Sequence, residues 1–513
     1  MSPSTSERDA RDLASFGYRQ RLDRRLGGFS AFAAGFSYLS VLTGSSQLFH
    51  LGYAAAGPAF FWTWPAVFAG QFLVALCFAE LAAQYPLSGG VYQWSKQVGS
   101  APVGWMAGWV YLASSVITLA SVALALQTTL PQLNPVFRVV GPADDRLAVA
   151  RNAVVLGCAV VALSTAINAV GVRLLARINN AGVFLEMAGA VLLIALLAWH
   201  ARRGPGVVFD GLGHGAGRTL GYLGPALAAS LMASFVLYGF DTAGTLAEET
   251  DDPRRRAPRA ILLALGAVGL AGSLLVFTAV RATPDLNDPA LSRGSGGLPY
   301  VVTAVLGGVL GAPFLAVVAL SIFVCTLTVH AAAVRLMFSM ARDDRLPFSR
   351  SLARVGEGSR TPTVPAVVIG VFAASILAVN ADFPHVIEVM ASVAVVWANL
   401  AYLFVTVPLL VRRLRPPVGS GTGRDPGGFG LGRWGPAVNA LAVAWGVLIV
   451  VNIGWPRPEI YGNGPLGRFG AAPATAAMLA CGGLYHVLAQ RGGRSGVLDE
   501  HRAEPYPHPE PSR

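Results

Sequence analysis

The sequence contains few charged residues. Asp, Glu, Lys and Arg make up only 13% of its 513 residues, whereas soluble domains carry roughly 25%, so the composition argues against an ordinary soluble protein. No G-x-x-x-x-G-K-[ST] loop is present, and ATP held by such a loop therefore does not drive the protein directly. No HExxH motif or Asp/His cluster points to a membrane-embedded enzyme. We expect neither enzymatic activity nor a cofactor.

Cysteine is also scarce. Cys77, Cys158, Cys325 and Cys481 all lie within apolar runs and are widely spaced. Cysteine is among the most buried residue types, and metal-binding cysteines usually show short spacings. We therefore interpret all four as buried packing residues and expect no metal site. The polar start of the chain has no apolar core, so no cleaved signal peptide is predicted.

Long apolar runs fill the chain instead. Hydrophobic residues make up 54% of the sequence, and about 20 of them in a row can cross a bilayer core of roughly 30 Å. The runs predict an all-α polytopic membrane protein. Its twelve transmembrane helices are expected at about residues 29–55, 59–84, 102–130, 152–170, 181–199, 222–248, 260–280, 312–340, 364–380, 384–411, 436–454 and 470–489.

The basic residues behind the net charge of +11 are distributed unevenly among the predicted loops. If the N-terminus lies in the cytoplasm, the loops on that side hold 27 Lys and Arg residues and the outer loops hold 9. Cytoplasmic loops of membrane proteins carry such an excess. Both termini are therefore predicted to be cytoplasmic, and the basic residues to face membrane lipid rather than nucleic acid. The Arg-, Ala- and Gly-rich composition, with Lys96 the only lysine, suggests a bacterial inner membrane.

Two predicted spans contain small polar residues at the depth of the bilayer core. The first carries Ser40 and the run Thr43-Gly-Ser-Ser-Gln47, and the sixth carries Gly239, Asp241, Thr242 and Gly244. Such residues also serve helix packing in membranes. A helix break at that depth is tolerated only beside protein or a wet cavity. The two interrupted spans are the first and the sixth, five spans apart along the chain. An inverted repeat of five plus five helices would produce this spacing. We therefore predict that helices 1 and 6 are discontinuous.

Three motifs carry a family resemblance. They are AEL…P-x-SGG-x-Y-x-W at 79–94, YGFDTAGTLAEETDDPRRRAPRAI at 238–261 and RLMFSMARDDRLP at 335–347. Their order and spacing resemble the amino acid–polyamine–organocation superfamily from about residue 17 to 490, and most closely its amino acid/choline transporter group. The resemblance implies a LeuT-like fold, with a segment 1–28, a first repeat 29–200, a second repeat 222–411, a linker 412–435, helices 11–12 at 436–490 and a tail 491–513.

The resemblance also implies a function. It predicts a secondary active transporter that takes up an amino acid or related amine by alternating access, with a proton as the coupling ion. An exchanger, a sodium symporter and a non-transporting nutrient sensor remain alternatives. The substrate is expected to be an amino acid, γ-aminobutyrate, a polyamine or choline.

The two breaks predict the substrate contacts. Freed amides around 42–46 can hold a carboxylate, and freed carbonyls near the ends of the inner half-helices can hold an ammonium group. The family resemblance then implies the expected set, which is Tyr38, Leu39, Thr43, Gly44, Ser45, Phe235, Tyr238, Gly239 and Asp241. By resemblance, Phe235 covers the substrate as a gate. Asp241 either caps the inner half-helix or pairs with a cationic substrate group.

Glu186 is the candidate for proton coupling. Ionisable residues inside spans are costly and usually functional, but Glu186 could also lie near the interface and pair with Arg173 or Arg177. Proton-coupled members that the chain resembles carry a Lys at what corresponds to this position. His330 is expected to be a packing residue. The loop arginines 254–256 are expected to pair with Glu248, Glu249 or the membrane surface, and both ends of the chain to be flexible.

Overall fold

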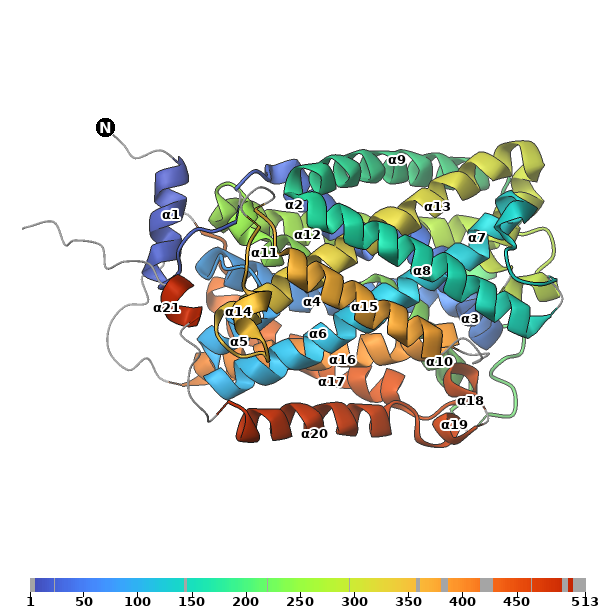
Figure 1. Ribbon diagram of the computed structural model, residues 1–513. Helices are drawn as coiled ribbons and strands as arrows, with labels where there is room; N and C mark the ends of the chain where they lie inside the picture. Colours follow the sequence, from blue (N-terminus) through green and yellow to red (C-terminus); the bar gives the residue numbers. More distant parts are fainter. Residues whose placement is uncertain are drawn as a thin grey trace, which may run out of the picture.

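The computed structural model is an elongated bundle of helices. It describes residues 5–22, 24–142, 145–218, 220–294, 296–356, 360–379, 386–415, 428–462, 464–490 and 497–501. Within these residues it contains helices and turns, and the one β-type contact is an isolated bridge between Leu26 and Thr250. Figure 1 shows most long helices running along the length of the bundle, with α1, α5, α14 and α21 at one end and α3, α7, α18 and α19 toward the other.

The helices have the following bounds. They are α1 (Thr5–Ser15), α2 (Gly28–Leu39), α3 (Val41–Ala56), η1 (Gly57–Trp62), α4 (Thr63–Gln84), α5 (Gly90–Val98), α6 (Ala101–Leu124), α7 (Leu126–Leu133), η2 (Pro135–Phe137), α8 (Arg146–Val170), α9 (Val172–Trp199), η3 (Pro205–Phe209), α10 (Leu223–Val236), α11 (Thr242–Thr245), η4 (Ala247–Glu249), α12 (Pro253–Ala282), η5 (Pro289–Ser292), α13 (Gly297–Arg342), α14 (Ser349–Leu352), α15 (Thr363–Val379), α16 (Val386–Leu414), η6 (Gly432–Trp434), α17 (Gly435–Gly454), α18 (Pro458–Tyr461), α19 (Pro465–Phe469), α20 (Ala472–Leu488) and α21 (Val497–His501).

Eight helical segments of the described chain are long and apolar enough to cross a membrane. They are Gly28–Gln84, Ala101–Leu133, Leu147–Val170, Val172–Trp199, Pro253–Ala282, Gly297–Arg342, Ile387–Leu414 and Gly432–Gly454. Three shorter apolar helices, Leu223–Val236, Thr363–Val379 and Ala472–Leu488, accompany them.

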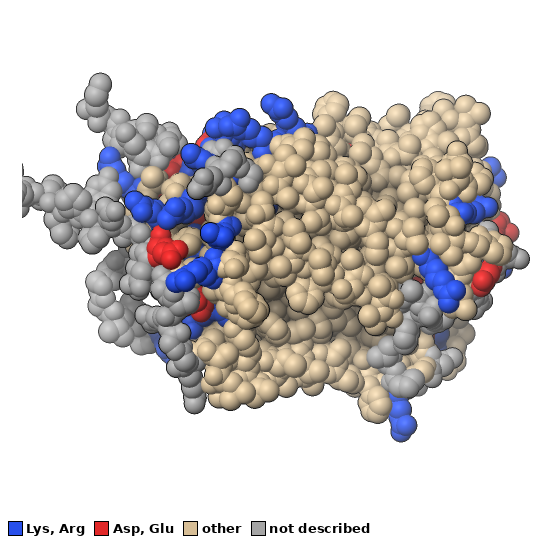
Figure 2. All heavy atoms as spheres, viewed as in Figure 1, with Lys and Arg blue, Asp and Glu red and all other residues tan. Residues whose placement is uncertain are grey.

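The surface of the bundle suits lipid. In α9, Phe184 and Val191 are 68% and 67% exposed, while Asn179 and Glu186 on the other side of the helix are buried. Apolar residues outside and polar residues inside are the opposite of a water-soluble helix. Figure 2 shows the same on the whole molecule: a broad uncharged band separates a densely basic end, which carries α1, α5 and α14, from a second end with fewer charges. We call the former the arginine-rich end.

Both polar stretches in mid-run contain non-helical residues. Between α2 and α3, Ser40 has φ 31° and ψ 91°. Between α10 and α11 the chain leaves the helix at Leu237–Asp241, and Gly239 has φ 92°. Residues with a side chain rarely adopt positive φ, so the local sequence favours glycine at 239, whereas Ser40 must be held by its surroundings.

The ends of the chain are more ordered than the sequence suggested. Residues 5–15 form α1, on which Asp9 and Leu13 are buried. Residues 497–501 form α21, and the His501 carbonyl accepts a hydrogen bond from the Arg19 amide at 2.9 Å. The prediction of flexible ends is therefore wrong for these residues. The remainder of the expected tail (491–496 and 502–513), and residues 416–427 of the linker, lie outside the described residues.

Two ion pairs are buried at the arginine-rich end. Glu249 pairs with Arg335 of α13 at 3.0 Å, and both side chains are 0% exposed. Glu248 pairs with Arg342 at 2.9 Å, with both side chains 1% exposed. The prediction that the loop arginines pair with Glu248 and Glu249 is wrong, because η4 faces the end of α13 rather than the arginines that follow it in sequence.

Arg335→Met should lower the melting temperature of the purified protein. The change leaves the Glu249 carboxylate buried without its partner, which costs about 3–5 kcal/mol. Removing both charges (Arg335→Met with Glu249→Met) should recover much of that loss. Thermal unfolding in detergent measures the effect. Arg218→Ala, which breaks the exposed pair with Glu459, is the matched control, and an equal shift in both single variants would contradict the prediction.

Candidate functional site

Ser40 and Tyr238, non-helical residues of the two runs, border one cavity. It lies between α2, α3, α6, α10 and α13. Its lining consists of Tyr38, Leu39, Ser40, Thr43, Gly44, Thr118, Val122, Phe235, Val236, Tyr238 and Cys325. The lining includes six of the nine predicted contact residues. Ser45, Gly239 and Asp241 lie outside it.

Glycine lets the two helices approach at this cavity. A Cβ on Gly44 would lie 2.3 Å from Cγ2 of Val236, and a Cβ on Gly239 would lie 1.9 Å from Cε1 of Tyr38. Gly239 also donates its backbone N–H to the Tyr402 hydroxyl at 2.8 Å. Gly239 therefore acts behind the cavity wall, by allowing the Tyr38 ring to pack on its backbone.

Glu186 reaches the gap between α2 and α3 from α9. Its Oε1 accepts hydrogen bonds from the Ser40 hydroxyl at 2.8 Å and from the Leu42 amide at 3.2 Å. The side chain is 1% exposed. Of the two interpretations, the interfacial carboxylate is wrong, because Glu186 lies in the protein interior against the gap.

The first amides of α3 are only partly available to a ligand. Such amides have no acceptor within their own helix, but the Leu42 amide is bonded to Glu186 and the Gly44 amide donates to the Ser40 carbonyl at 3.2 Å. The predicted set of amides at 42–46 therefore needs correction. The amides that remain without an acceptor in α3 are those of Val41 and Thr43.

Asp241 does not cap a helix. It occupies the N-cap position of α11 but makes no capping hydrogen bond with its side chain. Its Oδ1 instead accepts from the hydroxyls of Tyr111 and Tyr402, both at 2.6 Å. The preferred interpretation as a cap is wrong. Neither tyrosine was predicted, because each lies among other polar side chains of α6 or α16 and nothing in the local sequence sets it apart.

Aromatic rings form much of the cavity wall. The Tyr238 hydroxyl shares a 2.6 Å hydrogen bond with Thr118 of α6, and the Tyr238 ring packs edge-on against Phe235 and Tyr38. The buried Tyr38 hydroxyl has no hydrogen-bond partner among the described residues. A buried polar group without a partner is costly, so this hydroxyl is a place where a ligand would be favoured.

The polar residues of α13 are largely satisfied within the protein. Thr326 donates to the Ile322 carbonyl and Thr328 to Asn179. Cys325 donates its thiol to the Tyr38 carbonyl at 3.4 Å. His330 contacts the Ala366 carbonyl at 2.9 Å and Ser164 at 3.1 Å, as expected of a packing residue. In the described part of the chain, no three His, Cys, Asp or Glu side chains converge as metal ligands.

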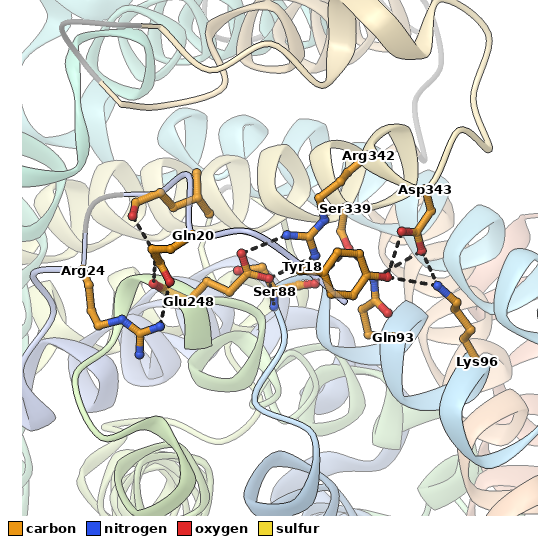
Figure 3. A network of polar contacts seen from close by, with 11 residues as sticks. Tyr18, Gln20, Arg24, Ser88, Gln93, Lys96, Glu248, Ser339, Arg342 and Asp343 are labelled. Atoms are coloured by element: carbon orange, nitrogen blue, oxygen red, sulfur yellow. Dashed lines mark hydrogen bonds and ion pairs between the residues drawn. The ribbon is translucent and has the colours of Figure 1, made fainter. Parts of the chain in front are cut away.

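A polar network closes the arginine-rich end (Figure 3). The Tyr18 ring stacks against Arg342, with its centroid 4.0 Å from the guanidinium carbon, and the Tyr18 hydroxyl donates to Asp343 at 2.8 Å. Lys96 pairs with Asp343 at 2.6 Å. Burial alone would raise the pKa of Asp343, but the charges of Lys96 and Arg342 outweigh burial and hold that pKa below its usual value. The network joins the N-terminal segment, α5 and the end of α13.

The sequence of this chain is similar to those of known proteins. A family model described as "Amino acid permease" matches residues 26–465. The amino-acid permease BAT1 of Arabidopsis thaliana is 27% identical over 86% of this chain and 88% of its own length. The GABA-specific permease of Saccharomyces cerevisiae is 24% identical over 90% and 80%. The low-affinity putrescine importer PlaP of Escherichia coli is 26% identical over 66% and 69%.

A solved structure shares the fold. The crystal structure of MhsT in complex with L-phenylalanine superposes with a TM-score of 0.54 at 17% identity, covering 83% of this chain and 97% of that one. The relatives are transporters rather than enzymes. From the family match over most of its length and its apolar helices, this chain is a multi-pass membrane protein that belongs to the amino acid permease family.

Proposed function

We propose that this protein is a proton-coupled secondary transporter that takes up a small amino acid by alternating access. The observation that carries the proposal is the convergence of two helix ends on one cavity, with the carboxylate of Glu186 bonded to the gap beside it. Helix ends expose amides and carbonyls that can hold a carboxylate and an ammonium group without a charged side chain. Phe235 and Tyr238 then cover the bound ligand.

The proposed topology has twelve crossings in a five-plus-five inverted repeat followed by two more helices. The segment Gly28–Gln84 spans 57 residues, enough for two crossings of about 20 residues each. The seven other long segments and three shorter helices supply the rest. The arginine-rich end faces the cytoplasm of an inner membrane. The network around Asp343 then closes the cytoplasmic side.

The proposed substrate is a small amino acid with one amine. A diamine needs an anionic partner for each ammonium group, because an unpaired charge in an apolar site is strongly disfavoured. The cavity lining contains no carboxylate. Glu186 and Asp241 lie outside the lining, and each accepts two hydrogen bonds through one oxygen, while Oδ2 of Asp241 has no partner among the described residues. An α-amino acid or γ-aminobutyrate fits this lining better than putrescine.

A proton is favoured over sodium as the coupling ion. Sodium held between the first and eighth helices needs several oxygen ligands. The Tyr38 carbonyl, near the end of α2, instead accepts a hydrogen bond from the Cys325 thiol. Glu186, a titratable carboxylate, accepts a hydrogen bond from Ser40 in the gap between α2 and α3.

Purified protein in liposomes should accumulate labelled L-alanine or γ-aminobutyrate when an inward proton gradient is imposed. A protonophore should abolish the accumulation, and replacing sodium by choline should leave it unchanged. Uptake into protein-containing liposomes that hold no internal substrate would exclude obligatory exchange. Uptake that requires sodium, or that ignores the proton gradient, would contradict the proposed coupling.

Glu186→Gln should keep substrate binding but lose concentrative uptake, because glutamine preserves the shape and hydrogen-bonding capacity of the side chain and cannot carry the proton. Binding is measured by thermal stabilisation, and uptake in liposomes with the proton gradient. Glu459→Gln, a carboxylate exposed at the opposite end from the arginine-rich one, is the control and should transport normally. Unchanged accumulation by Glu186→Gln would remove this residue from the coupling.

Gly239→Leu should abolish substrate binding. The new side chain must displace the Tyr38 ring, and the residue must keep a φ of 92° that a side chain disfavours. Gly239→Ala should weaken binding about 5- to 150-fold, by a cost of the order of 1–3 kcal/mol. Gly266→Ala, where a Cβ meets open space, is the control. Normal affinity in monodisperse Gly239→Leu would place the substrate elsewhere.

A further inference from the structure

Glu186 lies where a ligand carboxylate would bind. Leu42, whose amide donates to Glu186, is the second residue of α3, and a helix N-terminus favours an anion. Ser40, which also donates to Glu186, lines the cavity together with Thr43 and Gly44. The same end of α3 therefore serves a carboxylate of the protein and borders the space for a ligand.

We propose that Glu186 and the carboxylate of an amino acid compete for the N-terminal end of α3, so that the amino acid binds only together with a proton on Glu186. The inference rests on the proposed function and adds that the proton is needed because of the ligand's carboxylate. Its physical basis is that two carboxylates sharing one site cannot both stay ionised without strong repulsion.

Protonation changes what Glu186 does at the gap. A carboxylate only accepts hydrogen bonds, whereas a protonated carboxyl group also donates one. Neutral Glu186 can donate to the Ser40 hydroxyl, which can then turn its own proton toward Thr43 Oγ1, 2.6 Å away. The Leu42 amide loses its charged acceptor and becomes available to the ligand. The unpartnered Tyr38 hydroxyl, which also lines this cavity, adds a further donor.

No other acidic group competes for this position. Glu186 is the only acidic residue on α2, α3, α8, α9, α12 and α13, the helices at this contact. The other titratable groups on them are Tyr38, His50, Tyr53, Arg146, Arg151, Cys158, Arg173, Arg177, Arg254, Arg255, Arg256, Arg259, Arg281, Tyr300, Cys325, His330, Arg335 and Arg342. Of these, Cys325 interacts electrostatically with Glu186. It follows that the anionic rival of Glu186 is the ligand itself.

Amines without a carboxylate should behave differently. An amino alcohol has the ammonium group but no anion that needs the end of α3. An ionised Glu186 attracts that ammonium group instead of repelling a carboxylate. The pH dependence of binding should therefore vanish or change sign when the carboxylate of the ligand is replaced by a hydroxymethyl group.

The test measures binding of matched ligand pairs to the full-length protein in detergent. The pairs are γ-aminobutyrate with 4-amino-1-butanol and L-alanine with L-alaninol, each titrated by thermal stabilisation at about pH 5.5 and about pH 8. The side chains of Glu and Lys stay ionised across this range in water, and so do the corresponding groups of γ-aminobutyrate. A change in affinity between the two pH values then belongs to the protein.

We expect the amino acid to bind about 10- to 300-fold more tightly at the lower pH, because binding linked to one proton changes at most tenfold per pH unit. The amino alcohol should change less than about twofold or bind more tightly at the higher pH. In Glu186→Gln the amino acid should keep the tighter affinity at both pH values, while Glu459→Gln should behave as the wild type.

Four results would overturn the inference. Equal pH dependence for amino acid and amino alcohol, or pH-independent binding of the amino acid, refutes competition while leaving transport intact. Retention of the pH dependence by Glu186→Gln assigns the proton to another group. Absence of binding by both amino acids at both pH values would refute the proposed function as well. If Glu186→Gln does not fold, the ligand pairs on the wild-type protein decide alone.

Discussion

Peptide groups that leave a helix within the apolar interior must find new partners. An unsatisfied group there costs several kcal/mol, and the chain leaves the helix at Ser40 and again at 237–241. The partners come from distant helices: Glu186 of α9 accepts the Leu42 amide, and Tyr402 of α16 accepts the Gly239 amide. Each gap thus depends on one polar side chain that lies far away in sequence.

The carboxylates of Glu186 and Asp241 have different kinds of partner. Asp241 receives two phenolic hydroxyls, from Tyr111 and Tyr402, and Tyr402 is at the same time bonded to Gly239. This arrangement ties Asp241 to the structure around it. Glu186 receives a serine hydroxyl and a backbone amide at a helix N-terminus, a position that any other anion can use. Of the two, Glu186 is the carboxylate whose partners a ligand can take over.

Local composition predicted where the helices end, but not what holds them there. Ser40 and Gly239 lie at the gaps, and small residues tolerate irregular backbone and close approach, whereas the Thr-Gly-Ser-Ser run is helical within α3. The partners are separated by 146 residues for Ser40 and Glu186 and by 161 for Asp241 and Tyr402. Only the tertiary arrangement brings them together, so a single sequence contains no local signal of the pairing. The docked ends of the chain were missed for the same reason, because their partners lie elsewhere in sequence.

The segment after the second gap connects the cavity to the arginine-rich end. From Gly239 the chain passes through α11 into η4, where Glu248 and Glu249 form buried ion pairs with α13, and Glu248 also accepts the Ser88 amide at 3.0 Å. Separating η4 from α13 would leave buried charges unpaired, which costs several kcal/mol for each pair. Gly239 takes part in no ion pair, and rotation about it disturbs only the hydrogen bonds of its amide to Tyr402 and of its carbonyl to Thr242. A movement that opens this end therefore costs less if η4 and the end of α13 stay together and the backbone bends at the gap, next to the cavity.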